Sequence, residues 1–532
     1  MNLIDDAWLP LRNASGAINY TAPVGIADAA VVDVAMPRPD FQGAAWQWLI
    51  ALLQTTCAPR DHEEWADRWA DPPDPDELQA IFSAVRHAFW LTGDDGPRFM
   101  QDYDLPEDAR TSPISGLLIE APGAQTLKNN ADHFVKRGGC EAVSPASAAI
   151  ALFTMQINAP SGGKGYRTGL RGGGPLTTFV LPDDPATSLW RKLWLNVIPR
   201  DQWSYEDPDF HDWRVFPWLA RTRVSEGAGT ATYPEDVHPL HMYWAMPRRF
   251  VLEVEDAPCV CDLSGAESSQ SVRSVRTTNY GYNYEGAWDH PLTPYRFDPK
   301  KPQEAPLSQK GQQGGLGYRH WESLSFEDRE ERGLLPARVV RDYARKADVL
   351  SELDVPERRS RLWAFGYDMD NMKARGWYAT EMPLVAVADA HLPIFRDWIR
   401  TLTEPATAAA WRLRNEVKAA WFSRPKDAKG DFSTIDLRFW EATEAEFYEC
   451  VQGLSDQVHT TQDSLMPPEI AEYWRNVLHR ACERIFDEMA LSGDAEGLDM
   501  KRITAARNSL HRWLWSGKEM KALRQRASKE AA

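Results

Sequence analysis

Apolar residues recur every three or four positions in several long stretches of the chain, which is the pattern of helices packed on one side. The clearest early case has Trp46, Leu49, Ile50 and Leu53 on one side and ends before Pro59. The same pattern predicts helices over residues 41–56, 76–90, 147–158, 325–333 and 336–352.

Shorter apolar segments bounded by turn residues predict strands. These segments are residues 7–11, 30–34, 176–181 and 249–260. A hairpin is expected over 365–377, where a polar centre separates two aromatic flanks. Strands and helices therefore mix in the first two-thirds of the chain.

The pattern changes near residue 383, where long helical periods separated by short charged loops begin. The predicted helices are 384–402, 405–422, 436–453, 467–491 and 500–526. Consecutive helices with short connections pack antiparallel. We therefore predict an α+β protein with a mixed α/β domain over 1–380 and an antiparallel helix bundle over 381–532.

Length and charge restrict the possible functions. A chain of 532 residues is too long for one hydrophobic core, which agrees with two or more domains. Most of its 23 tryptophans are expected in those cores. The formal net charge of −17 argues against binding nucleic acid through overall charge, although one basic face on an acidic body stays possible.

The cysteines and the N-terminal residues indicate a cytoplasmic protein. The six cysteines are scattered, so a disulfide framework is not expected and a reducing compartment fits. No apolar run approaches the roughly 18 residues of a membrane span. The acidic start, MNLIDD, lacks the basic residues that open a signal peptide.

The most unusual segment is the glycine stretch, residues 161–175, with the sequence SGGKGYRTGLRGGGP. It holds seven of the 33 glycines and three cations, Lys164, Arg167 and Arg171. Glycine lets a backbone approach a ligand closely, and exposed N–H groups in such loops hold anions. The spacing fits neither a P-loop nor a dinucleotide fingerprint. Two interpretations stay open: a surface turn, or a loop that touches a phosphate backbone or a base edge.

Motifs for metal binding or catalysis are weak. Cys259 and Cys261 form a Cys-x-Cys pair, and Cys140 is the nearest further candidate, which is too few for a structural zinc site. There is no nucleophile elbow and no recognisable pair of catalytic carboxylates. Four separate segments suit nucleic acid instead: 128–137, 161–171, 273–284 and 366–375.

Several motifs carry a resemblance to a known family. They are NLIDDAWLPL at 2–11, AAIALF at 148–153 followed by Q-x-N-A-P, TGLRGGGPLTTF at 168–179, and GAWDHP at 286–291. The chain resembles the CasA (Cse-one) family of large subunits of Cascade, the type I-E CRISPR surveillance complex. The match runs in order over essentially the whole chain, and the motif at 168–179 is the most specific.

The resemblance implies a function without catalysis and without a cofactor. A member of this family has an N-terminal α/β body of unusual fold and a C-terminal four-helix bundle. It assembles with the other Cascade subunits and crRNA and reads a protospacer-adjacent motif on double-stranded DNA from the minor groove. It then helps to open the duplex for guide pairing and recruits a helicase–nuclease, while base pairing supplies the remaining specificity.

The resemblance also implies which residues contact nucleic acid. The groove-reading loop corresponds to Ser161, Gly162, Gly163, Lys164 and Gly165. A lysine that reads the motif in the family corresponds to Asn279, with Arg276 nearby. A wedge hairpin corresponds to Asn371, Met372 and Lys373, where Met372 replaces a glutamine and fits an apolar wedge. A loop at 128–137, with Phe134 and Lys136, corresponds to the contact with the crRNA end.

Two further expectations complete the interpretation. Some relatives bind zinc through four cysteines, but Ser144 and Ser147 occupy positions where further cysteines would stand, so no zinc is expected here. The alternative function, from a different class, is a phosphate- or nucleotide-binding enzyme that uses the glycine stretch. Nucleotide hydrolysis by the purified chain would distinguish it.

Overall fold

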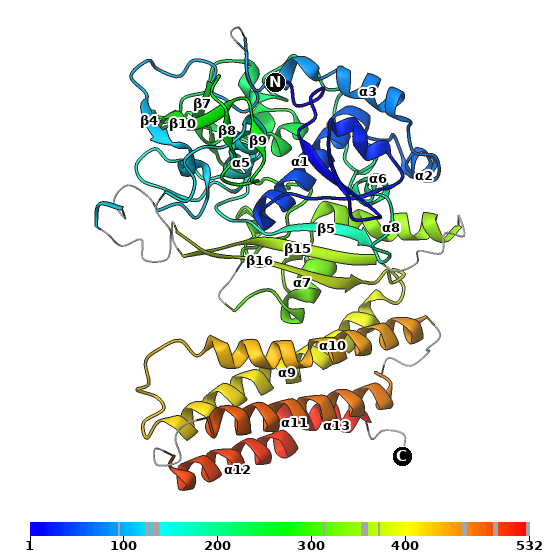
Figure 1. Ribbon diagram of the computed structural model, residues 1–532. Helices are drawn as coiled ribbons and strands as arrows, with labels where there is room; N and C mark the ends of the chain where they lie inside the picture. The colour runs from blue at the N-terminus through cyan, green and yellow to red at the C-terminus, as the bar shows by residue number, and fades with distance from the viewer. Residues whose placement is uncertain are drawn as a thin grey trace. The chain divides into compact units, whose positions relative to one another are not determined.

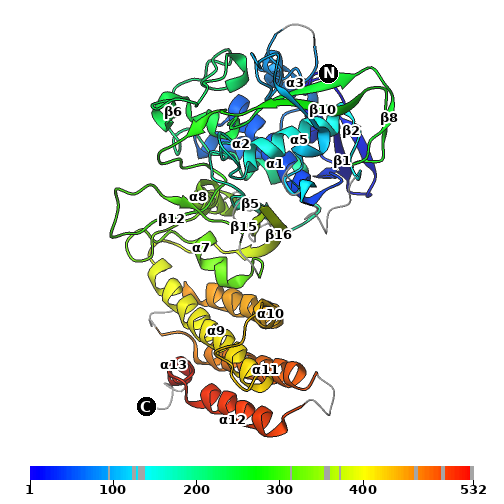
Figure 2. The same cartoon turned by 90° about the vertical axis from the view of Figure 1, so that its left-hand side faces the viewer.

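Two helices that are apolar on every face lie inside the N-terminal part of the protein. A computed structural model describes residues 1–93, 96–122, 127–129, 138–311, 314–352, 360–370, 373–459, 465–492 and 498–527. Helix α1 (Pro39–Cys57) has 15 buried residues and helix α5 (Pro145–Asn158) has 13. A helix without a polar face must be covered on all sides. The two helices contact each other, as Figure 2 shows, and form the centre of this part.

Three antiparallel sheets surround these helices. One has the order β2-β1-β3 and another β4-β10-β7. The third has the order β16-β15-β5 and lies as one layer in Figure 1. Their bounds are β1 Leu9–Asn13, β2 Ile18–Thr21, β3 Val31–Val34, β4 Arg110–Pro113, β5 Thr177–Pro182, β7 Arg249–Glu255, β10 Ser271–Thr278, β15 Ser360–Asp370 and β16 Lys373–Leu384.

Short elements complete the N-terminal part. The shorter helices are α2 His62–Ala70, α3 Pro75–Ser83, α6 Leu189–Trp194 and α8 Arg338–Glu352, and α7 Trp321–Ser325 lies where the chain passes between the two units described below. Its short strands are β6 Ala231–Thr232, β8 Cys259–Val260, β9 Glu267–Ser268, β11 Asn283–Tyr284, β12 Tyr295–Arg296, β13 Leu307–Ser308 and β14 Leu334–Leu335. The hairpin expected over 365–377 is confirmed by β15 and β16.

Two helix predictions in this part were wrong in extent. The helix expected over 76–90 ends at Ser83 and continues only as a short 3-10 turn over Arg86–Ala88. The helix expected over 325–333 is absent, because α7 ends at Ser325 and the chain then turns. There, reciprocal backbone hydrogen bonds join Asp328 and Leu334, and Gly333 has a φ of +60°, outside the helical region.

Tryptophans fill the interior, as expected from their number. Ten of the largest fully buried side chains are tryptophans. Several of their indole N–H groups donate to backbone carbonyls, and Trp65 and Trp194 donate to each other's carbonyl oxygens at 3.0 and 2.9 Å. Because a buried indole must keep a hydrogen-bond partner, these reciprocal bonds fix α2 against α6.

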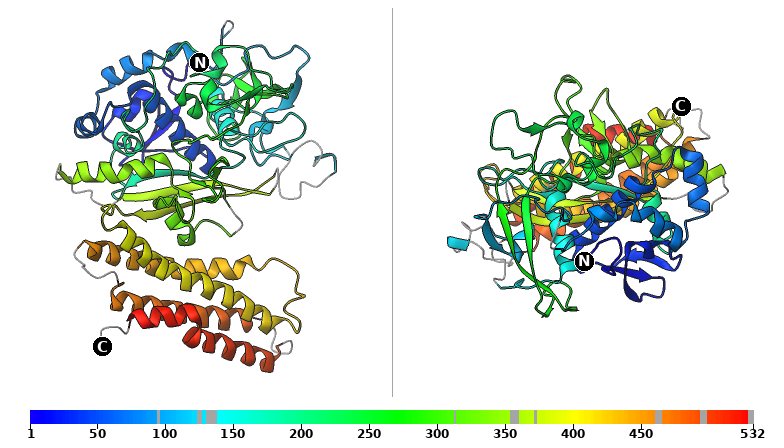
Figure 3. Two further views of the ribbon diagram at one scale, coloured as in Figure 1. Left: turned by 180° about the vertical axis from the view of Figure 1, so that it is seen from behind. Right: turned by 90° about the horizontal axis from the view of Figure 1, so that it is seen from above.

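The chain divides into two compact units. The first comprises residues 1–311 and 324–381, and the second comprises 312–323 and 382–532. Most of the second unit is helical, with α9 Leu392–Trp421, α10 Ser433–Val458, α11 Pro468–Ala490, α12 Met500–Ser516 and α13 Lys518–Ala527. Figure 3 shows the helices of the second unit from behind.

The second unit is an up-down-up-down bundle, in which α12 and α13 together provide the fourth rod. The contact of Tyr473 with Glu449 and the ion pair Arg438–Glu488 make α10 and α11 antiparallel. The α+β class, with a helical C-terminal part, is thereby confirmed. The predicted break between 402 and 405 is wrong, because α9 continues through the buried Pro405. Packing of α9 against four other helices outweighs the roughly 3 kcal/mol cost of an internal proline.

Candidate nucleic-acid interface

The glycine stretch leaves the end of α5 and returns to it, so residues 159–174 form a closed loop. The Gly174 N–H donates to the Asn158 carbonyl at 3.3 Å, and the Gly169 N–H donates to the Ala159 carbonyl at 3.0 Å. These two bonds tie the arms of the loop together at its neck. The outer residues are therefore presented by a closed frame.

Arg171 belongs to the interior of this frame. Its side chain donates to Gln47 Oε1 at 2.8 Å, to Thr177 Oγ1 at 3.0 Å and to Thr293 Oγ1 at 3.2 Å. Burial lowers the pKa of Arg171 to about 10, since no carboxylate offsets the loss of water. The arginine is used to hold the frame and is not available to a phosphate.

Arg167 is also occupied. Its Nε donates to Ser225 Oγ at 2.7 Å, a second nitrogen donates to the Ser225 carbonyl, and the guanidinium lies 5.9 Å from the centre of the Tyr280 ring. Of the three cations that suggested a phosphate loop, only Lys164 is exposed. The even spacing of charges along the stretch was therefore a misleading signal.

The tip of the loop is a turn closed by the Tyr166 N–H, which donates to the Gly163 carbonyl at 3.0 Å. Gly163 and Lys164 are exposed, and a Cβ built on Gly163 would meet no atom within 4 Å. Gly165 differs: its φ is +78°, and a Cβ there would lie 2.8 Å from Asn279 Cβ. Gly165 is needed for the fold, whereas Gly163 leaves a bare backbone facing outward.

A second turn supports the tip from behind. The Asn279 side-chain amide donates to the Lys164 carbonyl at 2.8 Å, and the Tyr280 N–H donates to the Gly165 carbonyl at 2.8 Å. Tyr280 itself has a φ of +67°, an uncommon conformation for a bulky residue. The structure therefore brings Asn279 together with the glycine loop and uses its amide to hold the loop.

Arg276 lies apart from the loop. In the sheet register, Arg276 pairs with Thr111 and Val251, whereas Thr277 pairs with Arg110. Residues that pair across strands share a face, and successive residues alternate. Arg276 and Arg110 are therefore on opposite faces of the sheet.

Arg110, which the sequence did not single out, is the arginine that reaches the loop. Its Nη2 donates to the Tyr166 hydroxyl at 3.1 Å. Arg276 instead lies near Arg98, whose pKa is lowered by burial and by the charge of Arg276. No sequence signal links Arg110 to Tyr166, because 56 residues separate them.

The predicted hairpin approaches the frame of the glycine loop. A Cβ on Gly174 would lie 2.5 Å from Met369 Cγ, so the frame packs closely on the end of β15. Across the hairpin, Arg375 donates to the buried Asp368 carboxylate at 2.7 and 3.2 Å. Lys373 is exposed at the start of β16, directly after residues 371–372 of the hairpin turn.

Four predicted contacts lie outside the described residues. These are Phe134 and Lys136 of the 128–137 loop, and Asn371 and Met372 of the hairpin tip. Their roles stay predictions.

One of the predicted metal-ligand candidates, Cys261, is hydrogen-bonded to a serine of α5. The Cys261 thiol donates to Ser147 Oγ at 3.2 Å. Burial alone would raise the pKa of Cys261, but hydrogen bonds with Ser147, Ser264 and the backbone outweigh it and lower that pKa to about 7. Across the described ranges, no three His, Cys, Asp or Glu residues lie close enough to hold a metal ion. The expectation about zinc stays a prediction.

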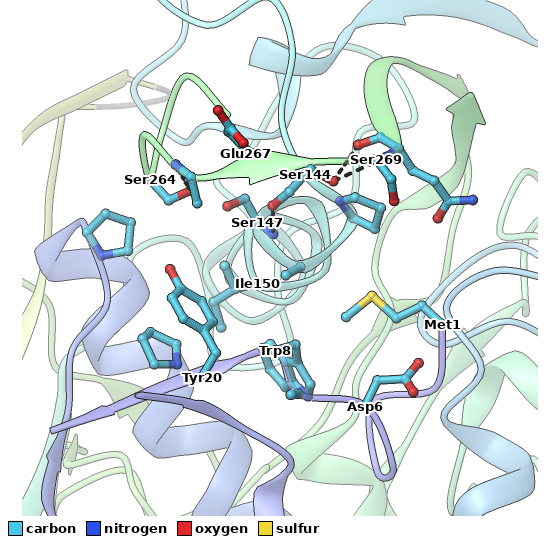
Figure 4. A pocket seen from close by; sticks show the side chains of 18 of the residues that line it. Met1, Asp6, Trp8, Tyr20, Ser144, Ser147, Ile150, Ser264, Glu267 and Ser269 are labelled. Atoms are coloured by element: carbon cyan, nitrogen blue, oxygen red, sulfur yellow. Dashed lines mark hydrogen bonds between the residues drawn. The ribbon is translucent and has the colours of Figure 1, made fainter. Parts of the chain in front are cut away.

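A cavity of about 420 Å³ lies beside these serines (Figure 4). Ser144, which caps α5, and Ser147 of α5 face Trp8 and Tyr20 across it, and Ser269 lies at one side. Of the predicted nucleic-acid contacts that the structure describes, none lines this cavity. It is a separate feature of the N-terminal part.

Comparison with known protein families identifies the family of this chain. A sequence profile described as "CRISPR-associated protein Cse1 (CRISPR_cse1)" matches residues 2–485. The chain belongs to the Cse1 family. Membership of this family supports the assignment of the chain as the large subunit of a Cascade complex, which it forms with other Cascade subunits.

Solved Cse1 structures have the same fold. Thermus thermophilus CasA (Cse1) is 18% identical with a TM-score of 0.66, over 97% of this chain and 99% of that chain. Acidimicrobium ferrooxidans Cse1 is 17% identical with a TM-score of 0.66, over 100% and 98%. Thermobifida fusca Cse1 is 17% identical with a TM-score of 0.68, over 99% and 98%. In the part of the chain that the structure describes, no helix is long and apolar enough to cross a membrane.

Proposed function

We propose that this Cse1-family chain is the subunit that reads the protospacer-adjacent motif for a type I-E Cascade complex in the cytoplasm. It acts without a catalytic step of its own. The glycine loop enters the minor groove of duplex DNA, the hairpin at 371–373 helps to separate the strands, and the assembled complex then recruits a helicase–nuclease. Phe134 and Lys136 belong to the loop that joins the subunit to the crRNA end.

One observation carries the proposal: Gly163 presents bare backbone at the exposed tip of a supported loop. The minor groove is only about 6 Å wide, so a backbone without side chains can approach base edges that a Cβ would hold away. The frame and the Asn279–Tyr280 turn hold that backbone in place before DNA arrives. Little ordering free energy is then lost on binding.

The proposed role of the hairpin has its own support. The close approach of Met369 to Gly174 sets the end of β15 against the frame of the glycine loop, and the Asp368–Arg375 ion pair ties β16 to that end. Reading and strand separation would therefore occur next to each other. An apolar side chain such as Met372 at the tip suits insertion between base steps.

The direct test is binding of the assembled complex to duplexes that carry every flanking trinucleotide. We expect a preferred subset, and we expect Gly163→Asp to abolish most of that preference without preventing assembly. The aspartate adds bulk and a negative charge where phosphates are close. Gly163→Ala is the matched variant, because its Cβ fits the fold and adds bulk without charge; we expect it to weaken the preference, but less than Gly163→Asp does.

Equal binding of all trinucleotides by the wild-type complex would contradict the proposal. So would an unchanged preference in Gly163→Asp. Hydrolysis of a nucleotide by the purified chain, lost in Lys164→Ala, would favour the alternative of a nucleotide-binding enzyme.

A further inference from the structure

Arg110 is an exposed cation at the side of the glycine loop. It is the first residue of β4, an edge strand of the β4-β10-β7 sheet, and its guanidinium donates to the neutral Tyr166 hydroxyl at 3.1 Å. Among the described residues, no carboxylate lies within 4 Å of the Arg110 guanidinium. The positive charge of Arg110 is therefore not neutralised by an ion pair within the described chain.

A second arginine lies beneath the same tyrosine. The Arg248 guanidinium lies 4.5 Å from the centre of the Tyr166 ring and donates to the Pro160 carbonyl at the start of the loop. Arg248 is only 6% exposed, and its Nε and Nη1 have no hydrogen-bond partner within the described chain. Burial lowers the pKa of Arg248 to about 10, which still leaves it charged at neutral pH.

These cations create a local positive field on a chain whose net charge is −17. Arg110 and Arg248 contact Tyr166 from two directions, and Lys164 is exposed two residues before that tyrosine. A partly buried charge is screened less by salt than an exposed one. The field therefore favours a polyanion at this corner.

We infer that Arg110 binds a phosphate of the DNA backbone beside the motif that the glycine loop reads. The inference rests on the proposed function. Two phosphate backbones border the narrow minor groove, so a loop that enters it brings the flanking side chains to phosphate oxygens. A guanidinium matches phosphate geometry with two parallel N–H donors.

The Tyr166 hydroxyl positions Arg110 for this contact. Held at 3.1 Å, the guanidinium is fixed at the side of the loop before DNA binds. Fixing a long side chain in advance lowers the entropy cost of each contact formed later. Tyr166 is therefore a positioning residue that acts through Arg110.

The test measures binding of the assembled complex to a preferred duplex at several salt concentrations. Each phosphate contact contributes about 0.9 to the slope of log K against log salt. We expect Arg110→Gln to reduce that slope by about 0.9 and to weaken binding at 0.1 M salt roughly fivefold to tenfold. The preference among flanking trinucleotides should stay at the wild-type ratio, because phosphate contacts carry no sequence information.

Three further variants separate charge from structure. Arg110→Lys keeps the charge and should retain the wild-type slope. Tyr166→Phe removes only the hydroxyl, so the slope should stay and binding should weaken less than in Arg110→Gln. Arg12→Gln changes an exposed arginine of β1 and should alter neither the slope nor the preference.

Two results would overturn the inference. The first is an unchanged salt slope in Arg110→Gln. The second is a slope that falls by the same amount in Arg12→Gln, which would show that loss of any exposed arginine lowers it; if Arg110→Gln instead kept the slope and lost the trinucleotide preference, Arg110 would be a support of the loop. Failure of the proposed function looks different: the wild-type complex would show no preference, while Arg110→Gln could still lower the slope.

Discussion

Burial and partners, rather than position in the sequence, decide what each charged residue of the glycine stretch does. Lys164, Arg167 and Arg171 are spaced evenly along a segment without acidic residues. Only Lys164 is exposed, because Arg167 is bound to Ser225 and Arg171 is buried among neutral groups. Residue type and spacing alone could not separate these roles.

Burial of a single residue, His241, makes the stability of the first unit depend on pH. His241 is fully buried between two partners: its Nδ1 bonds to the Arg214 carbonyl at 3.2 Å and its Nε2 to the Tyr284 hydroxyl at 2.9 Å. A carbonyl only accepts, so Nδ1 carries the proton and Nε2 accepts from Tyr284. Burial lowers the pKa of His241 from 6.5 to about 4, since water no longer stabilises the charged ring.

We predict that acid destabilises this unit below pH 6.5. Between pH 6.5 and about 4, the unfolded chain binds a proton at His241 that the folded chain does not, so stability falls as the pH falls. From pH 7 to pH 5 the loss from this residue is about 2 kcal/mol. Urea unfolding at both pH values measures it. His241→Gln should lower stability at pH 7 and reduce the pH dependence; an unchanged dependence would contradict the assignment.

At the scale of elements, hydrophobic spacing located most helices but not their ends. Helices α1, α5 and α8 lie close to the ranges that the pattern predicts. Helix α9 was predicted as two helices because Pro405 is a strong local signal for a break. Its neighbours Leu402, Ala406 and Ala409 are all buried, so packing extends the helix past the proline.

The end of the hairpin of β15 and β16 near residues 371–372 is held by a cross-strand ion pair, Asp368–Arg375. The Asp368 carboxylate is almost fully buried and receives two hydrogen bonds from Arg375. Removing only the arginine leaves a buried charge without its partner, which is costly. We predict that Arg375→Met loosens the hairpin end, so the complex should open target duplex more slowly while initial binding stays close to wild type.

Permanganate reactivity of the displaced DNA strand measures duplex opening by the Arg375→Met complex, and filter binding measures its initial binding to the duplex. The double variant Asp368→Asn with Arg375→Met removes both charges and should recover part of the opening rate. Normal opening in Arg375→Met would remove the support for a hairpin that acts in strand separation.

At the scale of the whole molecule, the helical unit includes residues 312–323, which the sequence analysis placed in the domain over 1–380. The boundary was predicted at 380/381, yet residues 312–323 also cluster with the helices. Tyr318 stacks on Phe447 with ring centres 4.3 Å apart, and its hydroxyl bonds to Thr443 Oγ1 at 2.9 Å. An aromatic residue from outside the helical series thus completes the core of the bundle.

We predict that Tyr318→Ala destabilises the helical unit by about 3–5 kcal/mol, because it removes a buried ring from a packed core. Tyr318→Phe keeps the ring and loses only the hydrogen bond, so about 1 kcal/mol is expected. Thermal unfolding of the full chain, followed by helical circular dichroism, measures both variants. Equal effects of the two substitutions would show that the ring does not support the bundle.

The sequence by itself determined the fold class, the helical C-terminal part, the hairpin and the family. These features follow from periodicity and from short motifs, which depend on residues close together in the chain. It also excluded the common nucleotide-binding motifs, because those require fixed local spacing.

Only the tertiary structure decided which residues form the candidate interface. It joined Asn279 to Lys164 across 115 positions, brought Arg110 to Tyr166 across 56, and placed Arg276 on the other face of its sheet. Hydrogen-bond partners and burial arise from segments that are distant in sequence. No local pattern contains that information, so the role of each glycine and cation became clear only once the chain was folded.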